Sequence, residues 1–175
     1  LNRKIQDKLN PPDKKKKEKA AGEFIYREGD KVMQVKNNYD ILWQSIKGTE
    51  DGQGVFNGDI GIIHSINPEA QYLDVLFDGE KIARYDFLQL DEIEPAYAIT
   101  VHKSQGSEFD AVVMPMFPTA PQLMNRNLLY TALTRAKKLV VMVGRDEVLY
   151  KMITNNRESM RFSGLKRRIE GIINV

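Results

Sequence analysis

The pattern of apolar residues changes once along this chain, and the change limits the fold to a small all-β unit followed by an α/β unit. Between residues 28 and 94, short apolar runs alternate with turn residues, and no helical pattern separates them. Beyond Pro95 the apolar runs are continuous, as at 111–114 and 139–143, and helix-forming segments separate them. Continuous apolar strands that alternate with helices indicate a parallel sheet covered on both faces.

The segment 28–94 is expected to form a small antiparallel barrel of the SH3-like kind. Its apolar runs are short and closely spaced, which is typical of such barrels, and they lie at 32–35, 60–66, 72–77 and 82–85. Asp78 and Gly79 predict a tight hairpin turn. The glycine-rich stretch 37–57 is expected to be a long mobile loop that contains Trp43.

Residues 1–27 are expected to hold a short helix and a basic linker. Ile5 and Leu9 lie four residues apart on one face of a helix that Pro11 ends. The segment 11–23 has the composition of a solvated linker. Its four lysines, 14–17, favour a flexible connector, and contact with nucleic-acid phosphates is the alternative.

The net charge of +2 hides an uneven distribution. Residues 28–94 carry five basic and fourteen acidic side chains, whereas residues 1–20 and 95–175 each have a basic excess. A polyanionic partner is therefore expected on the flanking segments rather than on the middle one.

The chain contains no cysteine and only two histidines. This composition excludes a disulfide scaffold, a cysteine zinc site and thiol catalysis, and we expect no bound metal. No apolar run reaches the roughly 20 residues of a membrane helix, and the N-terminus lacks a signal-peptide core. We therefore expect a soluble cytoplasmic protein with no membrane partner. Because the chain begins at Leu1 rather than methionine, we also expect it to be part of a longer protein.

Two segments hold the residues best suited to chemistry, although the sequence has no G-x-x-x-x-G-K-[ST] phosphate loop. The first, 98–110 (AITVHKSQGSEFD), follows a predicted strand at 97–99, and ligands of open α/β sheets bind beyond such carboxyl ends. The second, 127–137 (NLLYTALTRAK), is predicted to be a helix with Arg135 near its end. A guanidinium held there could spread positive charge over phosphate oxygens.

The first segment resembles motif V of superfamily 1 DNA helicases, and LLYTALTRAKK resembles their motif VI. The N-terminal LNRKIQDKLNP resembles the entry into the second motor domain of the RecD-like (RecD/TraA-type) branch. GDKVMQVKNNYD and VFNGDIGII resemble the start of the SH3-like barrel that this branch inserts into that domain. The resemblance extends over nearly the whole chain, in the right order.

The resemblance implies an α/β fold, in which a RecA-like half-motor of the P-loop type, a parallel sheet with flanking helices, carries an inserted SH3-like barrel. It implies three domains: the helix and linker at 1–27, the barrel at 28–94 and the RecA-like C-terminal domain at 95–175. In such helicases, ATP hydrolysis with Mg²⁺ drives movement along single-stranded DNA, typically 5′ to 3′. The first motor domain supplies the phosphate loop and the Mg²⁺ ligands.

This chain is therefore expected to be the C-terminal part of an ATP-dependent DNA helicase, inactive by itself and holding neither ATP nor Mg²⁺ alone. Its implied partners are single-stranded DNA, the missing N-terminal motor domain of the same polypeptide and other recombination subunits. The alternative is a non-catalytic module that binds nucleic acid or protein through the barrel.

The resemblance also assigns roles to residues. The expected catalytic residue is an arginine finger for the γ-phosphate, Arg135. The ATP side is expected to include the same arginine together with Gln105, Gly106 and Glu108. The DNA contacts are expected from Thr100 and His102, and from Trp43 as a base-stacking candidate.

Each of these residues has a plainer alternative. His102 could be a core or capping histidine, Glu108 a surface acid and Arg135 a solvated ion-pair partner. The hydroxyl side chains that could simply cap a helix are Thr100 and Ser104. A cluster of three acids is expected to form a polar barrel rim rather than a metal site: Asp91, Glu92 and Glu94.

Overall fold

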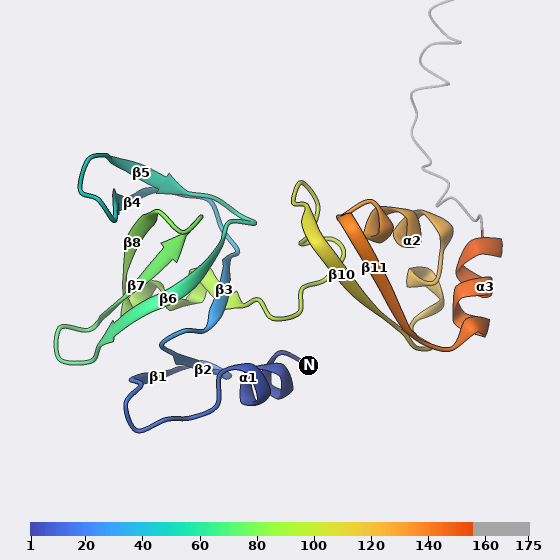
Figure 1. Ribbon diagram of the computed structural model, residues 1–175, viewed down its shortest axis with the longest axis horizontal. Coiled ribbons are helices and arrows are strands. Elements are labelled where there is room, and N and C mark those ends of the chain that lie inside the picture. The colour runs from blue at the N-terminus through green and yellow to red at the C-terminus, as the bar shows by residue number, and fades with distance from the viewer. Residues whose placement is uncertain (156–175) are drawn as a thin grey trace, which may run out of the picture. The chain divides into compact units, whose positions relative to one another are not determined.

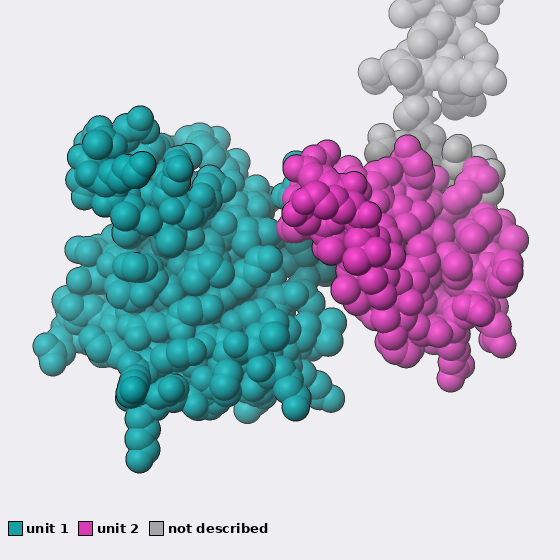
Figure 2. All heavy atoms as spheres, viewed as in Figure 1, with its two compact units in different colours: residues 1–107 teal, residues 108–175 magenta. Residues whose placement is uncertain are grey.

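The structure is a computed structural model that describes residues 1–155. The chain forms two compact units, one of residues 1–107 and another that begins at Glu108 (Figures 1 and 2). The segment 95–107 therefore belongs to the same compact unit as the barrel, whereas the family resemblance assigns it to the C-terminal domain at 95–175, and that assignment stays a prediction. None of the helices within residues 1–155 is long and apolar enough to cross a membrane.

The first unit contains a seven-stranded antiparallel sheet, as the short alternating runs predicted (Figure 1). Its strand order is β5-β4-β8-β7-β6-β3-β9. The bounds are Lys31–Gln34 (β3), Asn38–Ser45 (β4), Asp51–Val55 (β5), Ile60–Asn67 (β6), Tyr72–Phe77 (β7), Lys81–Asp86 (β8) and Ile93–Pro95 (β9). A 3₁₀ helix, η1 (Phe87–Glu92), joins the last two strands.

The barrel core follows from strand alternation and from two local irregularities. A register shift between Ile63 and Ser65 lets both Ile63 and Ile66 face the core, although they are three residues apart. Gly61 passes so close to β7 that a β-carbon there would lie 2.5 Å from Cγ1 of Val75. Ile63 and Ile66 pack in the barrel core with other buried side chains, which include Val32, Leu73, Val75, Phe77, Ala83 and Tyr85.

The hairpin turn at 78–79 is confirmed, since both residues have positive φ as a tight type I′ turn requires. The expectation of a long mobile loop at 37–57 is wrong, because this stretch forms the hairpin β4–β5. Trp43 lies in β4 rather than in a loop, and it pairs with Gly52 across the hairpin. A β-carbon on Gly52 would lie 2.5 Å from the indole ring, so this glycine makes room for the ring instead of providing flexibility.

The N-terminal helix is confirmed as α1 (Asn2–Leu9), whereas the linker is only partly correct. Residues 18–27, which we expected to be part of a linker, form a second hairpin of β1 (Glu18–Ala21) and β2 (Phe24–Arg27). The buried guanidinium of Arg27 donates to Glu18 at 2.5 Å and to the carbonyl of Asn10. The hairpin is therefore anchored to the end of α1 rather than being free in solvent.

A buried carboxylate joins α1, the barrel and the chain that leaves the barrel. Asp30 is 2% exposed and accepts four hydrogen bonds. The amides of Gln6 and Asn10 donate at 2.5 and 2.7 Å, the backbone N–H of Arg27 at 2.7 Å and the hydroxyl of Tyr97 at 2.9 Å. Burial and this bond to Asp30 raise the pKa of Tyr97 to about 12. Residues 6–10, 27–30 and 97 are therefore held as one structure.

The second unit contains a parallel pair of strands, β10 (Phe109–Met116) and β11 (Ala136–Gly144). A short 3₁₀ turn, η2 (Pro121–Leu123), and α2 (Arg126–Leu133) connect them, and α3 (Asp146–Thr154) follows β11. These elements confirm the predicted strands at 111–114 and 139–143 and the helix near 145–153. A further helix that the pattern predicts at 158–170 lies outside the described residues.

Within residues 108–155, both helices cover the same face of the parallel pair (Figure 1). Met114 and Met116 pack there against Leu129, Val148 and Met152. The opposite face is apolar but exposed, and it consists of Ala111, Val113, Pro115, Leu139, Val141 and Val143. The expectation that helices cover both faces is therefore not met in the part of the chain that the structure describes.

Candidate functional site

The polar residues of the first predicted segment lie in a compact turn before β10. The backbone N–H of Ser104 donates to the carbonyl of Thr100 at 3.1 Å, and that of Gln105 donates to His102 at 3.3 Å. The predicted strand at 97–99 is wrong, because these residues belong to no strand. The polar groups therefore do not follow the carboxyl end of a sheet strand, and the turn 100–107 positions them instead.

Two hydroxyl groups stabilise this turn. Thr100 Oγ1 accepts the backbone N–H of Lys103 at 3.2 Å, and Ser104 Oγ donates to the carbonyl of Val101 at 2.7 Å. Ser104 is buried, so its capping role accounts for it fully, whereas Thr100 is exposed. A cap at Thr100 and a contact with a ligand are compatible.

The remaining predicted residues of the turn are open to solvent. His102 and Gln105 are exposed, which contradicts the alternative of a core histidine. Gly106 has a φ of +85°, and no atom lies within 4 Å of the place where a β-carbon would be. The turn therefore needs glycine for its backbone conformation rather than for space.

Arg135 and Glu108 lie at the same end of the parallel strand pair. The backbone N–H of Phe109 donates to the carbonyl of Arg135 at 2.8 Å, so the residues that precede β10 and β11 are adjacent. Glu108 and Lys137 form an ion pair at 3.3 Å, with both side chains more than half exposed. A second exposed pair at this end joins Lys138 and Asp110 at 2.9 Å.

The composition of 127–137 predicted that Arg135 lies on a helix, but it does not. Helix α2 ends at Leu133, and Arg135 occupies the turn that leads into β11. Its Nε donates to the carbonyl of Thr131 at 3.2 Å and its Nη2 contacts the hydroxyl of Thr134 at 3.4 Å. The guanidinium thus stabilises the carbonyl end of α2, where the helix dipole favours a cation.

Trp43 is the third candidate for DNA contact, and its ring is partly covered by the barrel. The indole packs on Gly52, it is half-buried against the barrel core, and the Lys81 ammonium is 5.0 Å from the ring centre. Its role as a stacking residue stays a prediction.

The three acids at 91–94 have separate partners, which agrees with a polar rim. Asp91 pairs with Lys36, and this contact lowers the pKa of the Asp91 carboxyl. Glu92 accepts from the side-chain amides of Asn38 and Gln34. Among residues 1–155, no group of three acidic or histidine side chains could hold a metal ion.

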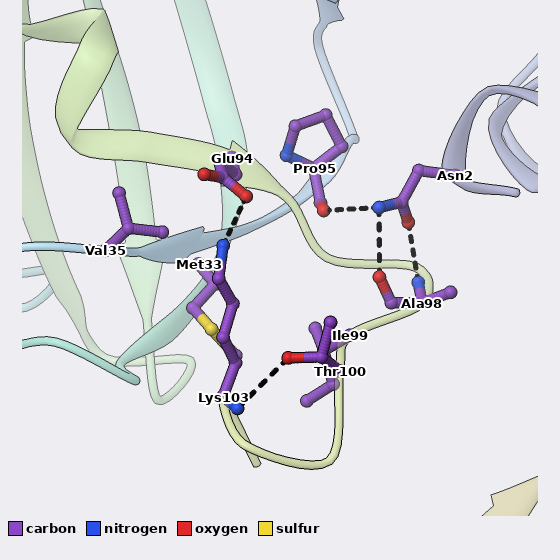
Figure 3. Close-up of a pocket in the computed structure, with 9 residues that line it drawn as sticks. All are labelled: Asn2, Met33, Val35, Glu94, Pro95, Ala98, Ile99, Thr100 and Lys103. Carbon is purple, nitrogen blue, oxygen red and sulfur yellow. Dashed lines mark hydrogen bonds and ion pairs between the residues drawn. The ribbon is translucent and has the colours of Figure 1, made fainter. Parts of the chain in front are cut away.

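Sequence reasoning missed the ion pair between Lys103 and Glu94, at 2.6 Å. It lies at a small pocket that also includes Asn2 and Thr100 (Figure 3). The position of Lys103 between two candidate residues, Thr100 and Gln105, was the available signal. The partner could not be inferred, since Glu94 belongs to the last barrel strand.

Two family models match the chain. Residues 1–77 match the SH3 domain of ATP-dependent RecD-like DNA helicases. Residues 95–143 match the UvrD-like helicase C-terminal domain.

Curated relatives are similar over most of this chain but are much longer. The chain is 33% identical over 158 residues to an uncharacterized protein of Methanocaldococcus jannaschii, covering 82% of this chain and 13% of that protein. It is 32% identical over 148 residues to the ATP-dependent RecD2 DNA helicase of Deinococcus radiodurans (85% and 18%). It is 33% identical over 133 residues to the RecBCD enzyme subunit RecD of Mycobacterium tuberculosis (71% and 21%). The chain thus spans about a fifth or less of these relatives.

A solved structure concerning DNA unwinding at forked double-stranded DNA by two coordinating Pif1 helicases has a similar fold. The TM-score is 0.56 at 19% sequence identity, and the match covers 97% of this chain and 42% of that one.

Proposed function

We propose that this chain, which belongs to the RecD-like family of superfamily 1 DNA helicases, supplies one wall of an ATP site and part of the grip on single-stranded DNA. Hydrolysis would then drive movement along the DNA in a protein that joins this chain to a phosphate-loop domain. By itself the chain is expected to hydrolyse no ATP, because its sequence has no phosphate loop.

The observation that supports this proposal best is the shared position of Arg135 and Glu108. Phe109 and Arg135 are joined by a backbone hydrogen bond of 2.8 Å, which fixes the starts of both strands relative to each other. Two lysines, Lys137 and Lys138, lie at the same end. Three cations, Arg135 and the two lysines, and two carboxylates, Glu108 and Asp110, therefore lie at one end of the strand pair, and this net positive charge suits phosphate oxygens.

Arg135 would act as the arginine finger. Its guanidinium would leave the carbonyl of Thr131 and spread positive charge over the γ-phosphate oxygens as negative charge develops there. A phosphate is a stronger partner for a guanidinium than a neutral carbonyl is. Because the backbone of Arg135 is tied to Phe109, the side chain can move while its origin stays fixed.

ATP and Mg²⁺ would be held mainly by the other motor domain. The cationic edge of β10–β11 suits phosphate oxygens, whereas no metal-binding acid cluster exists among residues 1–155. When bound, Mg²⁺ would neutralise part of the negative charge of the phosphates. Glu108, Gly106 and Gln105 would line the nucleotide side, with Gln105 linking it to the DNA.

The DNA contacts would come from the turn 100–107. Thr100 and His102 are both exposed on it, so each can reach a phosphate or a base. Within residues 108–155, one apolar face of β10–β11 is exposed, which supports a RecA-like domain that further elements complete, since a two-stranded sheet is marginal alone.

The test is DNA-stimulated ATPase activity in the full-length helicase. Arg135→Ala is expected to lower kcat by about 10³-fold or more, in line with other arginine fingers, while the affinity for single-stranded DNA stays within about twofold. Arg145→Ala is the matched control, since Arg145 is exposed at the opposite end of β11 and should leave kcat unchanged. Retained turnover in Arg135→Ala would refute the finger.

A non-catalytic binding module is the second candidate, and one observation favours it. Tyr39 and Phe56 form an exposed edge-to-face pair, 5.6 Å between ring centres, on the β4–β5 hairpin side of the barrel. Such a pair could hold a protein or a nucleic acid. If this candidate is correct, Tyr39→Ala should abolish binding of that protein or nucleic acid, and Arg135→Ala should leave the DNA-stimulated ATPase activity unchanged.

A further inference from the structure

A small pocket lies where the last barrel strand meets the turn 100–107 (Figure 3). Its volume is about 120 Å³. Met33, Val35 and Ile99 give it an apolar lining. The polar side chains that also line it are Asn2, Glu94, Thr100 and Lys103. The pocket is therefore lined by apolar and polar groups in about equal measure, with a cation and a hydroxyl among the polar ones.

The cation is held by a carboxylate of the barrel. Lys103 Nζ lies 2.6 Å from Glu94 Oε2, and the two side chains are 38% and 43% exposed. An ion pair this exposed contributes little to stability, so its partners separate easily. The hydroxyl of Thr100 accepts the backbone N–H of Lys103 at 3.2 Å, which keeps the lysine at the pocket when the ion pair opens.

We propose that this pocket is a subsite for one nucleotide of single-stranded DNA, which enters when its phosphate displaces Glu94 from Lys103. The single-ring base of a pyrimidine, which has both apolar and polar edges, would enter the pocket. The inference rests on the proposed function, since it assigns a place to the DNA that Thr100 and His102 are expected to contact.

Three properties of the pocket support this occupant. A cavity of roughly 150 Å³ encloses a single aromatic ring such as benzene, so this open pocket of about 120 Å³ can take most of one ring while the remaining edge stays in solvent. A base must be unstacked to enter, which favours a single strand over a duplex. The phosphate neighbouring such a base needs a cation, and Lys103 provides one beside the pocket.

Glu94 would then act as an internal competitor of the phosphate. The segment 28–94 carries nine more acidic than basic side chains, so DNA approaching the barrel is repelled unless a local cation is released. Neutralising Glu94 should therefore tighten DNA binding, which is the opposite of what loss of a stabilising residue would do.

The test measures binding of a fluorescein-labelled oligo(dT) to the 175-residue chain by anisotropy over a salt series. Glu94→Gln is expected to tighten binding about two- to fivefold at low salt, the range that an exposed ion pair can supply. It should also steepen the salt dependence by about one phosphate contact. Lys103→Gln should weaken binding and flatten that dependence.

The matched control is Asp91→Asn, which also removes one acid from the barrel and releases a lysine, Lys36, although neither of these residues lines the pocket. Equal tightening by Asp91→Asn and Glu94→Gln would overturn the inference, because barrel charge alone would then explain both. A full effect of Glu94→Gln in a Lys103→Gln background would overturn it as well.

The base is tested with oligonucleotides that lack one base at successive positions. One position is expected to lose affinity, and Ile99→Phe, which fills the pocket, should remove that loss. A uniform response to all positions would refute the base site. If Ile99→Phe does not fold by circular dichroism, the ion-pair comparison still decides the role of Lys103.

The outcomes separate the two proposals. DNA binding that depends on Thr100 and His102 but not on Glu94 would refute the subsite alone. Absence of any DNA binding by the wild-type chain would refute its proposed grip on DNA.

Discussion

Replacing Asp30 with alanine should destabilise the first unit strongly, because this buried carboxylate accepts four hydrogen bonds. Two of the donors, the amides of Gln6 and Asn10, belong to residues that are 7% and 4% exposed. A buried donor left without an acceptor costs about 1–3 kcal/mol. The two amides together therefore set a loss of about 2–6 kcal/mol in the free energy of unfolding.

The assay is urea unfolding followed by the fluorescence of Trp43, which is the sole tryptophan and lies in β4. It therefore reports on the first unit and not on the second. Asp30→Asn keeps one acceptor oxygen and should fall between wild type and Asp30→Ala. Asp91→Asn breaks only an exposed ion pair and should change stability by less than about 1 kcal/mol.

The reasoning fails if Asp30→Ala loses less than about 1 kcal/mol with an unchanged denaturant slope. That result would mean that water replaces the carboxylate at no cost, and that the four bonds do not hold α1 to the barrel. A loss of several kcal/mol for Asp91→Asn would be equally damaging, since it would remove the distinction between buried and exposed carboxylates.

Three further predictions concern the same unit. Gly61→Ala should lower the free energy of unfolding by about 1–3 kcal/mol, because the new β-carbon would lie 2.5 Å from Val75. The midpoint of urea unfolding measures this loss. An unchanged midpoint would mean that β6 and β7 can separate freely. Gly52→Val should push the indole of Trp43 outward and shift its emission to longer wavelength, whereas an unchanged spectrum would contradict the close ring contact. Tyr97 has a folded pKa raised to about 12 from 10, so its stabilising contribution is complete below pH 10 and is lost as the pH rises toward 12. Between pH 10 and pH 12, the free energy of unfolding of Tyr97→Phe should therefore fall less than that of the wild type, as measured by urea titrations. An equal fall in the two proteins would rule out a role for the ionisation of Tyr97.

Local patterns predicted the barrel well where one rule decided the structure. The predicted apolar run 72–77 forms a strand with Leu73, Val75 and Phe77 in the core, and the dipeptide Asp78-Gly79, with two positive φ angles, forms the predicted hairpin turn. The prediction of a loop at 37–57 was wrong because glycine can either give a loop flexibility or make room for a large side chain on a neighbouring strand. There Gly52 lies under a tryptophan from the neighbouring strand, a tertiary contact that no local pattern contains.

The candidate site shows the same division. The order of the motifs identified Arg135 and Glu108, and strand pairing brings them to one end. Helix composition continued past Leu133, so the turn that holds Arg135 could not be located from the sequence. The Lys103–Glu94 pair was also beyond reach, because it depends on how the last barrel strand meets the following turn.

The contacts of Asn2 have a consequence for how such a barrel can be gained or lost. Its side chain donates to the carbonyls of Pro95 and Ala98, both at 2.9 Å, and accepts the N–H of Ala98 at 2.6 Å (Figure 3). The two ends of the segment 2–98, which contains the barrel, are therefore adjacent in space. Excising everything between residues 2 and 98 would leave two ends already adjacent, which a short splice could join, and an unrelated module with neighbouring termini could be grafted in its place.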